Sequence, residues 1–143
     1  IPLPNDELPA PREIEAVSEA LLANVYRALA VREEAAAYDR LAVSVLGTLR
    51  EEIYLKQRKA LALEGRGGAR ARVESVEVRK VEGIAATENG YRADVSWTAA
   101  GSVIHFGHRH VRRNNYKARL RVVAEGSTWK IGALEILELE RTR

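Results

Sequence analysis

The spacing of apolar residues changes abruptly at one glycine-rich segment, Gly65-Arg66-Gly67-Gly68, and this change constrains the fold more than any other feature. Before this segment, apolar side chains recur every three or four residues. After it, they alternate with polar side chains. These periods are those of one face of an α-helix and one face of a β-strand. Helices followed by strands predict an α+β fold, with the helices on one face of an antiparallel sheet.

Residues 12–64 are predicted to form two or three helices. The stretch lacks proline and is rich in Ala, Leu, Glu and Arg, which favour helices. Breaks are expected near residues 33–38 and near Gly47, and Gly65 is the expected helix end. The spacing of Thr48 and Glu51 is that of a capping box, which predicts the start of a helix. The apolar face of the first helix is predicted to contain Ile14, Val17, Leu21, Val25 and Leu29.

Residues 69–140 are predicted to form a four-stranded antiparallel meander. Asn89-Gly90 is the strongest turn signal, because a type I′ hairpin turn needs positive φ at both central positions. Two further turns are expected at Phe106-Gly107 and Glu125-Gly126. Side chains predicted to face the helices include Tyr91, Ala93, Val95, Trp97, Tyr116, Ala118, Leu120 and Val122.

Residues 1–11 hold all four prolines and are predicted to form an extended lead-in or linker before a single domain, residues 12–143. The 143 residues contain no Met, so we expect the chain to be a piece of a larger protein. The absence of Cys excludes disulfides, thiolate ligands and a Cys nucleophile. No apolar run approaches the ~20 residues of a membrane-spanning helix. Membrane attachment is therefore expected only through a segment outside this chain.

All three histidines of the chain lie close together, at His105, His108 and His110. If Phe106-Gly107 is a two-residue hairpin loop, His105 pairs with His108 and Val103 pairs with His110. Paired residues share a face, so the three imidazoles would lie together near one hairpin tip. Three histidines can hold Zn²⁺ with a fourth position open. Hydrogen-bonded histidines at an exposed tip, or a pH-sensitive cluster, are the alternatives.

Polar residues continue along the same predicted face below the histidines. The same register places Arg112 opposite Gly101 and Tyr116 opposite Trp97, and Glu135 is predicted to lie opposite Tyr116. An unpaired buried polar group costs ~1–3 kcal/mol, so this polarity predicts an opening in the core. The predicted rim of a small-molecule pocket consists of Trp97, Arg112, Asn114, Tyr116 and Glu135. An uncovered sheet end or a contact surface between two copies of the chain is the alternative.

The opposite face of the third predicted strand is basic, with Arg109, Arg113, Lys117, Arg119 and Arg121. Such a row of cations can follow nucleic-acid phosphates. Few aromatic residues lie between them, and the sequence contains no nucleic-acid-binding motif. We therefore expect a solvated strand face and no nucleic-acid partner.

The order of elements resembles the NTF2-like (cystatin-like) group, and the ending Trp129-Lys130-Ile131 resembles the last strand of many such domains. The resemblance implies helices packed into the concave face of a curved sheet, as in a cone with a pocket. The segment from Tyr26 to Arg58, with Trp97 and the histidines, also resembles the soluble tail of uncharacterised bacterial membrane proteins. Domains of this group have many functions, so the resemblance does not imply one.

The sequence thus predicts a non-catalytic ligand-binding or assembly domain of a larger bacterial protein, one attached to a membrane by another segment. The expected partners are the rest of that protein, a second copy or a small molecule, with no cofactor. The extracytoplasmic side of the membrane is the favoured compartment. The alternative is a protein that binds a metal such as Zn²⁺, or converts a small molecule, through His105, His108 and His110.

Overall fold

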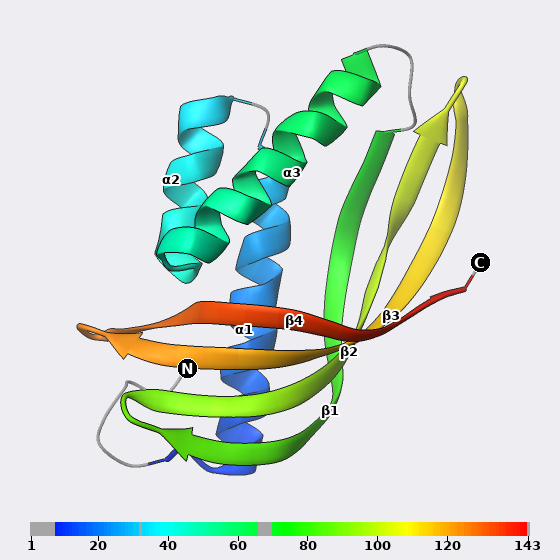
Figure 1. The fold of residues 1–143 in the computed structure, drawn as a ribbon. Helices are drawn as coiled ribbons and strands as arrows, with labels where there is room; N and C mark the ends of the chain where they lie inside the picture. Colours follow the sequence, from blue (N-terminus) through cyan, green and yellow to red (C-terminus); the bar gives the residue numbers. More distant parts are fainter. Residues whose placement is uncertain (1–7, 32, 66–69, 143) are drawn as a thin grey trace.

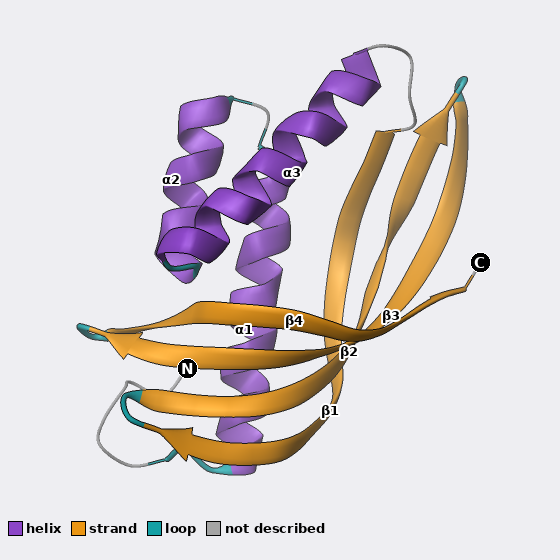
Figure 2. Ribbon diagram, viewed as in Figure 1, coloured by secondary structure: helices purple, strands orange, loops and turns teal. Residues whose placement is uncertain are grey.

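Three helices precede a four-stranded sheet in a computed structural model of the chain, which describes residues 8–31, 33–65 and 70–142. The strands are antiparallel and lie in sequence order β1-β2-β3-β4, so the predicted α+β meander is confirmed (Figures 1 and 2). The elements are α1 (Pro11–Leu29), α2 (Glu34–Ser44), α3 (Gly47–Gly65), β1 (Arg70–Thr87), β2 (Gly90–His105), β3 (His108–Glu125) and β4 (Thr128–Thr142).

The helix boundaries follow from local hydrogen bonding. Pro11 occupies the first turn of α1, where its missing N–H costs nothing, and the Ala10 amide donates to the Glu13 carboxylate at 3.3 Å. The Glu33 carboxylate accepts hydrogen bonds from two amides in the first turn of α2. The first break in the helices therefore lies just before the predicted interval 33–38. None of the described helices is long and apolar enough to cross a membrane.

The start of α3 is fixed by the sheet. The Leu46 amide donates to the Ile131 carbonyl of β4 at 3.0 Å, and the Leu46 carbonyl accepts from Arg50 in the first turn of α3. Val45 forms an isolated parallel bridge with the same Ile131. The helix therefore begins at Gly47, one residue before the predicted capping residue Thr48, because the neighbouring backbone is already paired with β4.

Gln57 joins the middle of α3 to the end of α1. Its side-chain amide is buried and donates to the carbonyls of Leu29 at 2.7 Å and Val31 at 3.0 Å. A helix leaves its last four carbonyls without partners within the helix, and burial of such groups is costly. Gln57 satisfies two of the carbonyls at this end and so fixes the position of α3 against α1.

The sheet bends strongly, and its two halves have different surroundings (Figure 2). Three bulges on β1, at Val73/Ser75, Val78/Lys80 and Glu82/Ala85, increase the local twist and bend. Glu19 of α1 reaches the second bulge, where its carboxylate accepts from the Val78 amide at 2.9 Å. One half of the sheet packs on α1, and the shared core includes Ile14, Val17, Leu21, Tyr91, Val95, Trp97, Leu120, Val122 and Ile131.

The other half of the sheet extends away from this core. We call residues 101–112, the distal ends of β2 and β3 with the turn between them, the hairpin arm. Figure 1 shows the arm rising at the side of the molecule, with its turn near the far end of α3. His108, Arg109, His110, Val111 and Arg112, on the β3 side of the arm, are all exposed. The β3 side of the arm therefore presents its side chains to solvent.

The turn between β1 and β2 differs from the prediction by one residue. Thr87 pairs with Gly90, so the two turn residues are Glu88 and Asn89, and Gly90 belongs to β2. Asn89 has no positive φ, so the predicted type I′ geometry at Asn89-Gly90 is wrong. Glycine is required at position 90 for another reason, because a Cβ there would overlap the Val122 carbonyl of β3.

Candidate functional site

Three of the five predicted pocket residues meet in a packed cluster with α1. Trp97 and Tyr116 stack with ring centroids 5.1 Å apart and planes 16° apart. The Trp97 indole N–H donates to the Tyr26 hydroxyl at 3.3 Å, and the Asn114 amide donates to the Tyr116 hydroxyl at 3.4 Å. Trp97 is only 3% exposed. The side chain of Tyr26 thus lies against Trp97, a residue of the predicted pocket rim, and satisfies its indole donor.

The other two predicted pocket residues lie elsewhere. Arg112 is exposed on the hairpin arm, in the predicted register opposite Gly101. Glu135 pairs with Arg119, not with Tyr116, so the predicted position of this acid is wrong. The turn residues are Gly126 and Ser127, since Glu125 pairs with Thr128.

Two register shifts add to this displacement, at Lys117/Ala118 and Arg121/Val122. As a result Leu139 takes the place opposite Tyr116. Because each bulge adds one residue to β4, the alternation of side chains in the sequence does not follow the alternation of faces. Glu135 therefore contributes to the convex face beside Arg119, away from the helices.

The predicted pairing of the histidine hairpin is confirmed. His105 pairs with His108, Val103 pairs with His110, and Phe106-Gly107 forms the two-residue loop. The side chains of His108 and His110 are exposed, while that of His105 lies outside the described part of the structure. No group of three or more His, Cys, Asp or Glu side chains able to hold a metal is found among the described residues. Zinc binding by all three histidines stays a prediction.

Two tyrosines in the core are held in the neutral form. Burial raises the pKa of Tyr91 to about 12, against the lowering effect of its 3.0 Å hydrogen bond with Ser18. Burial also raises the pKa of Tyr26 to about 12, and its neighbour Tyr116 adds to the increase. The Tyr91 ring packs edge-on against Trp129 with centroids 5.8 Å apart. Both hydroxyls therefore serve as structural hydrogen-bonding groups at neutral pH.

We expect the protein to lose stability as the pH rises from about 10 to about 12. An unfolded tyrosine ionises near its ordinary pKa of 10.0, whereas folded Tyr91 keeps its proton until about 12. The unfolded state binds fewer protons in this window, so unfolding becomes easier with rising pH, by up to roughly 2.7 kcal/mol for Tyr91. Urea unfolding at several alkaline pH values, with tyrosinate absorbance, measures this loss. A Tyr91→Phe variant should show a smaller pH dependence, and ionisation of all five tyrosines near pH 10 would contradict the expectation.

Three residues of the basic row on the convex face are paired with carboxylates of β1 and β2. Lys117 lies 3.0 Å from Glu82, and Arg119 forms two hydrogen bonds with Asp94 at 2.9 and 3.3 Å. The Arg119 guanidinium holds the pKa of Asp94 below its ordinary value. Arg109 is paired with Glu74 at 2.9 Å. These ion pairs across strands support the expectation of a solvated strand face.

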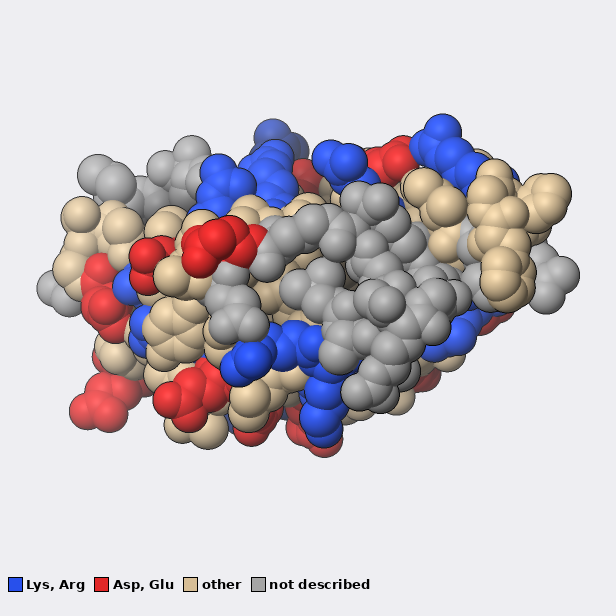
Figure 3. All heavy atoms as spheres, turned by 90° about the horizontal axis from the view of Figure 1, so that it is seen from above, with Lys and Arg blue, Asp and Glu red and all other residues tan. Residues whose placement is uncertain are grey.

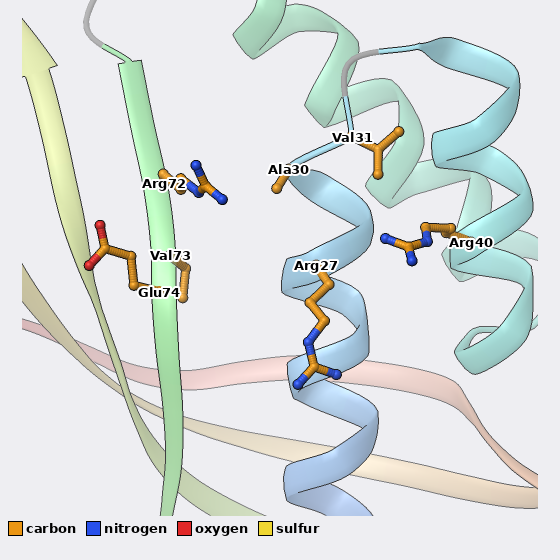
Figure 4. Close-up of a pocket in the computed structure, with 7 residues that line it drawn as sticks. All are labelled: Arg27, Ala30, Val31, Arg40, Arg72, Val73 and Glu74. Carbon is orange, nitrogen blue, oxygen red and sulfur yellow. The ribbon is translucent and has the colours of Figure 1, made fainter.

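An open pocket of about 550 Å³ lies where α1 and α2 face the start of β1. Arg72 projects from β1 toward α1, Arg40 projects from α2 toward α1, and Arg27 extends along α1 itself (Figure 4). The described residues of the lining are Arg27, Ala30, Val31, Arg40, Arg72, Val73 and Glu74. The pocket thus combines a small apolar surface with guanidinium groups from three elements.

The charge of this pocket is strongly positive. Arg27 donates to the neutral Asn24 amide oxygen at 3.0 Å, and among the described residues no carboxylate pairs with Arg27, Arg40 or Arg72. Glu74, the acid of the lining, points to the other side of β1, where it pairs with Arg109 (Figure 4). Guanidinium groups match carboxylate and phosphate geometry with paired donors. The arrangement is suited to binding a small oxyanion.

Sequence reasoning missed this pocket. Arg27 and Arg40 are on different helices, and Arg72 follows the glycine-rich segment. Taken alone, each arginine occupies a sequence position typical of a solvated helix face or a strand end. The packing of α1 on α2 and on β1 brings them to one place, and no local motif marks that packing.

The chain shares its fold with a known structure. The crystal structure of the intermembrane space region of chloroplast protein ARC6 superposes with a TM-score of 0.59 at 17% sequence identity, over 92% of this chain and 98% of that one. A de novo designed β-sheet protein solved by NMR is less similar, with a TM-score of 0.42, 12% identity and 90% of each chain covered. No protein-family model and no curated protein matches the sequence. The similarity to the ARC6 region shows the α+β arrangement of this chain and nothing about its function.

Proposed function

We propose that this chain is a non-catalytic ligand-binding domain, and that the pocket beside α1 takes a small anionic molecule with carboxylate or phosphate groups. The observation that carries the proposal is the placement of Arg27, Arg40 and Arg72 around one pocket with no carboxylate partner among the described residues. The pocket volume of about 550 Å³ suits a ligand of metabolite or drug size. Ala30, Val31 and Val73 offer apolar contact to the body of such a ligand.

The cations of this pocket differ in their pairing from several cations of the sheet. Elsewhere on the surface Lys117, Arg119 and Arg109 are each paired with a carboxylate of β1 or β2. The three pocket arginines have no such partner within the described chain, although their mutual repulsion disfavours this grouping. A bound oxyanion supplies the missing negative charge and accepts charge-assisted hydrogen bonds from them. The grouping of three arginines without described carboxylate partners around one pocket supports a ligand in place of a structural ion pair.

The proposal includes the larger context that the sequence predicts. The ARC6 structure is one region of a larger protein, which supports a comparable place for this chain. Membership of the NTF2-like group, a bacterial source and attachment to a membrane through another segment remain parts of the proposal. The concave sheet packed on α1 supports the first of these.

Titration calorimetry with citrate and with inorganic pyrophosphate at low ionic strength tests the pocket. We expect binding by the unaltered chain and roughly tenfold weaker binding by each of Arg40→Gln and Arg72→Gln, since each removes one charge-assisted contact. The matched control is Arg92→Gln, an exposed arginine of β2 that is not part of the pocket lining. Absence of heat with both anions at millimolar concentration, or an equal loss in the control, would refute the proposal.

A further inference from the structure

The hairpin arm ends in exposed apolar side chains. Phe106 is 84% exposed at the apex of the turn, and Ile104 and Val111 on the adjoining strands are 42% and 65% exposed. The pairing of Ile104 with Arg109 and of Ser102 with Val111 makes Ile104 and Val111 diagonal neighbours on one face. Three apolar side chains thus gather at the end of the arm. We call Ile104, Phe106 and Val111 the arm tip.

The backbone at the apex of the turn is strained at the residue that carries the phenyl ring. Phe106 has φ of 48° and Gly107 has φ of 78°, and Phe106 is the only non-glycine with positive φ among the described residues. Asn, Asp and Gly are the residues that favour this first position, because a bulky side chain disfavours positive φ. Strain together with exposure of an aromatic ring points to a function at the apex.

The charged residues of the arm are all basic. The arm contains Arg109 and Arg112 and no acidic residue. Glu74 of β1 neutralises Arg109, whereas Arg112 has no partner among the described residues. Looking onto this end of the molecule, Figure 3 shows an uncharged group of atoms at the right-hand edge, bordered by Lys and Arg. The tip is therefore apolar, and the same arm contains, among its described residues, one unpaired cation, Arg112.

We propose that the hairpin arm docks on an anionic membrane surface, with the arm tip inserted at the level of the lipid headgroups and Arg112 close to their phosphates. A protein interface that is stable needs roughly 800 Å² from each partner, far more than three side chains at a convex tip supply. Shallow insertion beside anionic lipids needs only a few apolar side chains and neighbouring cations. Size and charge together favour a lipid surface over a protein partner.

The projection of the arm fits this geometry. The tip lies at the far end of the two strands from the core around α1, so a flat surface can meet it without disturbing that core (Figure 1). Among the described residues, the docking surface and the arginine pocket have none in common. The two proposals can therefore fail separately.

Co-sedimentation with vesicles tests the proposal, using phosphatidylcholine alone and phosphatidylcholine mixed with phosphatidylglycerol. We expect the chain to sediment with the anionic vesicles at low salt and much less with the neutral ones. Phe106→Asn should weaken this binding roughly tenfold, because it removes the apolar apex. Arg112→Gln should weaken it about fivefold through the loss of one cation near the surface.

Phe106→Asn separates binding from folding, because Asn accepts positive φ more readily than Phe and should leave the Tm equal or higher. The matched control is Leu55→Gln, which removes an apolar side chain that is 56% exposed on α3. The control should bind anionic vesicles as the unaltered chain does. Equal sedimentation with neutral vesicles, no sedimentation with anionic vesicles, or unchanged binding by Phe106→Asn would each overturn the proposal, and the last two would favour an acidic protein partner.

Discussion

Replacing Trp97 by alanine should lower the free energy of unfolding by about 4 kcal/mol, within the range for large aromatic residues in a core. Trp97 is nearly fully buried, stacks on Tyr116 and donates its indole N–H to Tyr26. The alanine variant would lose the packing of the indole, open a cavity between α1 and the sheet and leave the Tyr26 hydroxyl without this donor. Each of these effects disfavours the folded state.

Urea unfolding, followed by far-UV circular dichroism, measures the change in the free energy of unfolding. An unaltered m-value would show that the unfolded state is unchanged. The control is Trp97→Phe, which keeps an aromatic ring against Tyr116 and should cost less than half as much. A loss below about 1.5 kcal/mol for the alanine variant would contradict the packing described for this cluster. It would mean that the helix-facing surface of β2 is not closed by α1.

Replacing Gly101 by alanine should cost about 3 kcal/mol, the upper part of the range for overpacked sites. A Cβ at this position would overlap the Arg72 carbonyl oxygen and approach the Cα of Val73. Both are backbone atoms of β1 beside the bulge at Val73/Ser75, so relief requires the strands to separate. We expect loss of pairing between the arm and the start of β1.

Gly132→Ala is the matched control in β4. An added Cβ there would lie 2.9 Å from the Arg121 guanidinium, the end of a long exposed side chain that can move aside. The control should change the free energy of unfolding by less than about 1 kcal/mol. Thermal unfolding of both variants, with amide exchange along β1, compares the two sites. Similar small losses at both would show that β1 is not held close to Gly101.

The register of β2 and β3 could be predicted because one short loop determines it. Phe106-Gly107 forms a two-residue turn. Because β2 and β3 pair without a bulge, counting back along both strands from this turn gives the pairing of Trp97 with Tyr116. The register of β3 and β4 could not be obtained in this way. Two bulges and a turn displaced by one residue put Leu139 opposite Tyr116, and alternation in the sequence does not show where a strand bulges.

The candidate site was harder to predict because its parts depend on tertiary packing. The sequence placed Trp97, Tyr116 and Asn114 together, but it did not show that Tyr26 of α1 would lie against them. That contact depends on the rotation of α1 on the sheet. The cationic pocket likewise needs the relative positions of three elements. The local sequence pattern predicts helices, strands and the faces that their side chains share. Which side chains fill the space between two elements can be seen only in the folded structure.

The bridge from Val45 and Leu46 to Ile131 has a consequence for how the chain is made. A ribosome produces the helices first, and β4, the strand that fixes the start of α3, emerges after them and after the other three strands. At ordinary rates of translation the apolar side of α1 waits on the order of ten seconds for its covering sheet. Ile14, Val17 and Leu21 stay exposed during that time unless a chaperone shields them. Completion of this fold thus has to wait for the synthesis of β4.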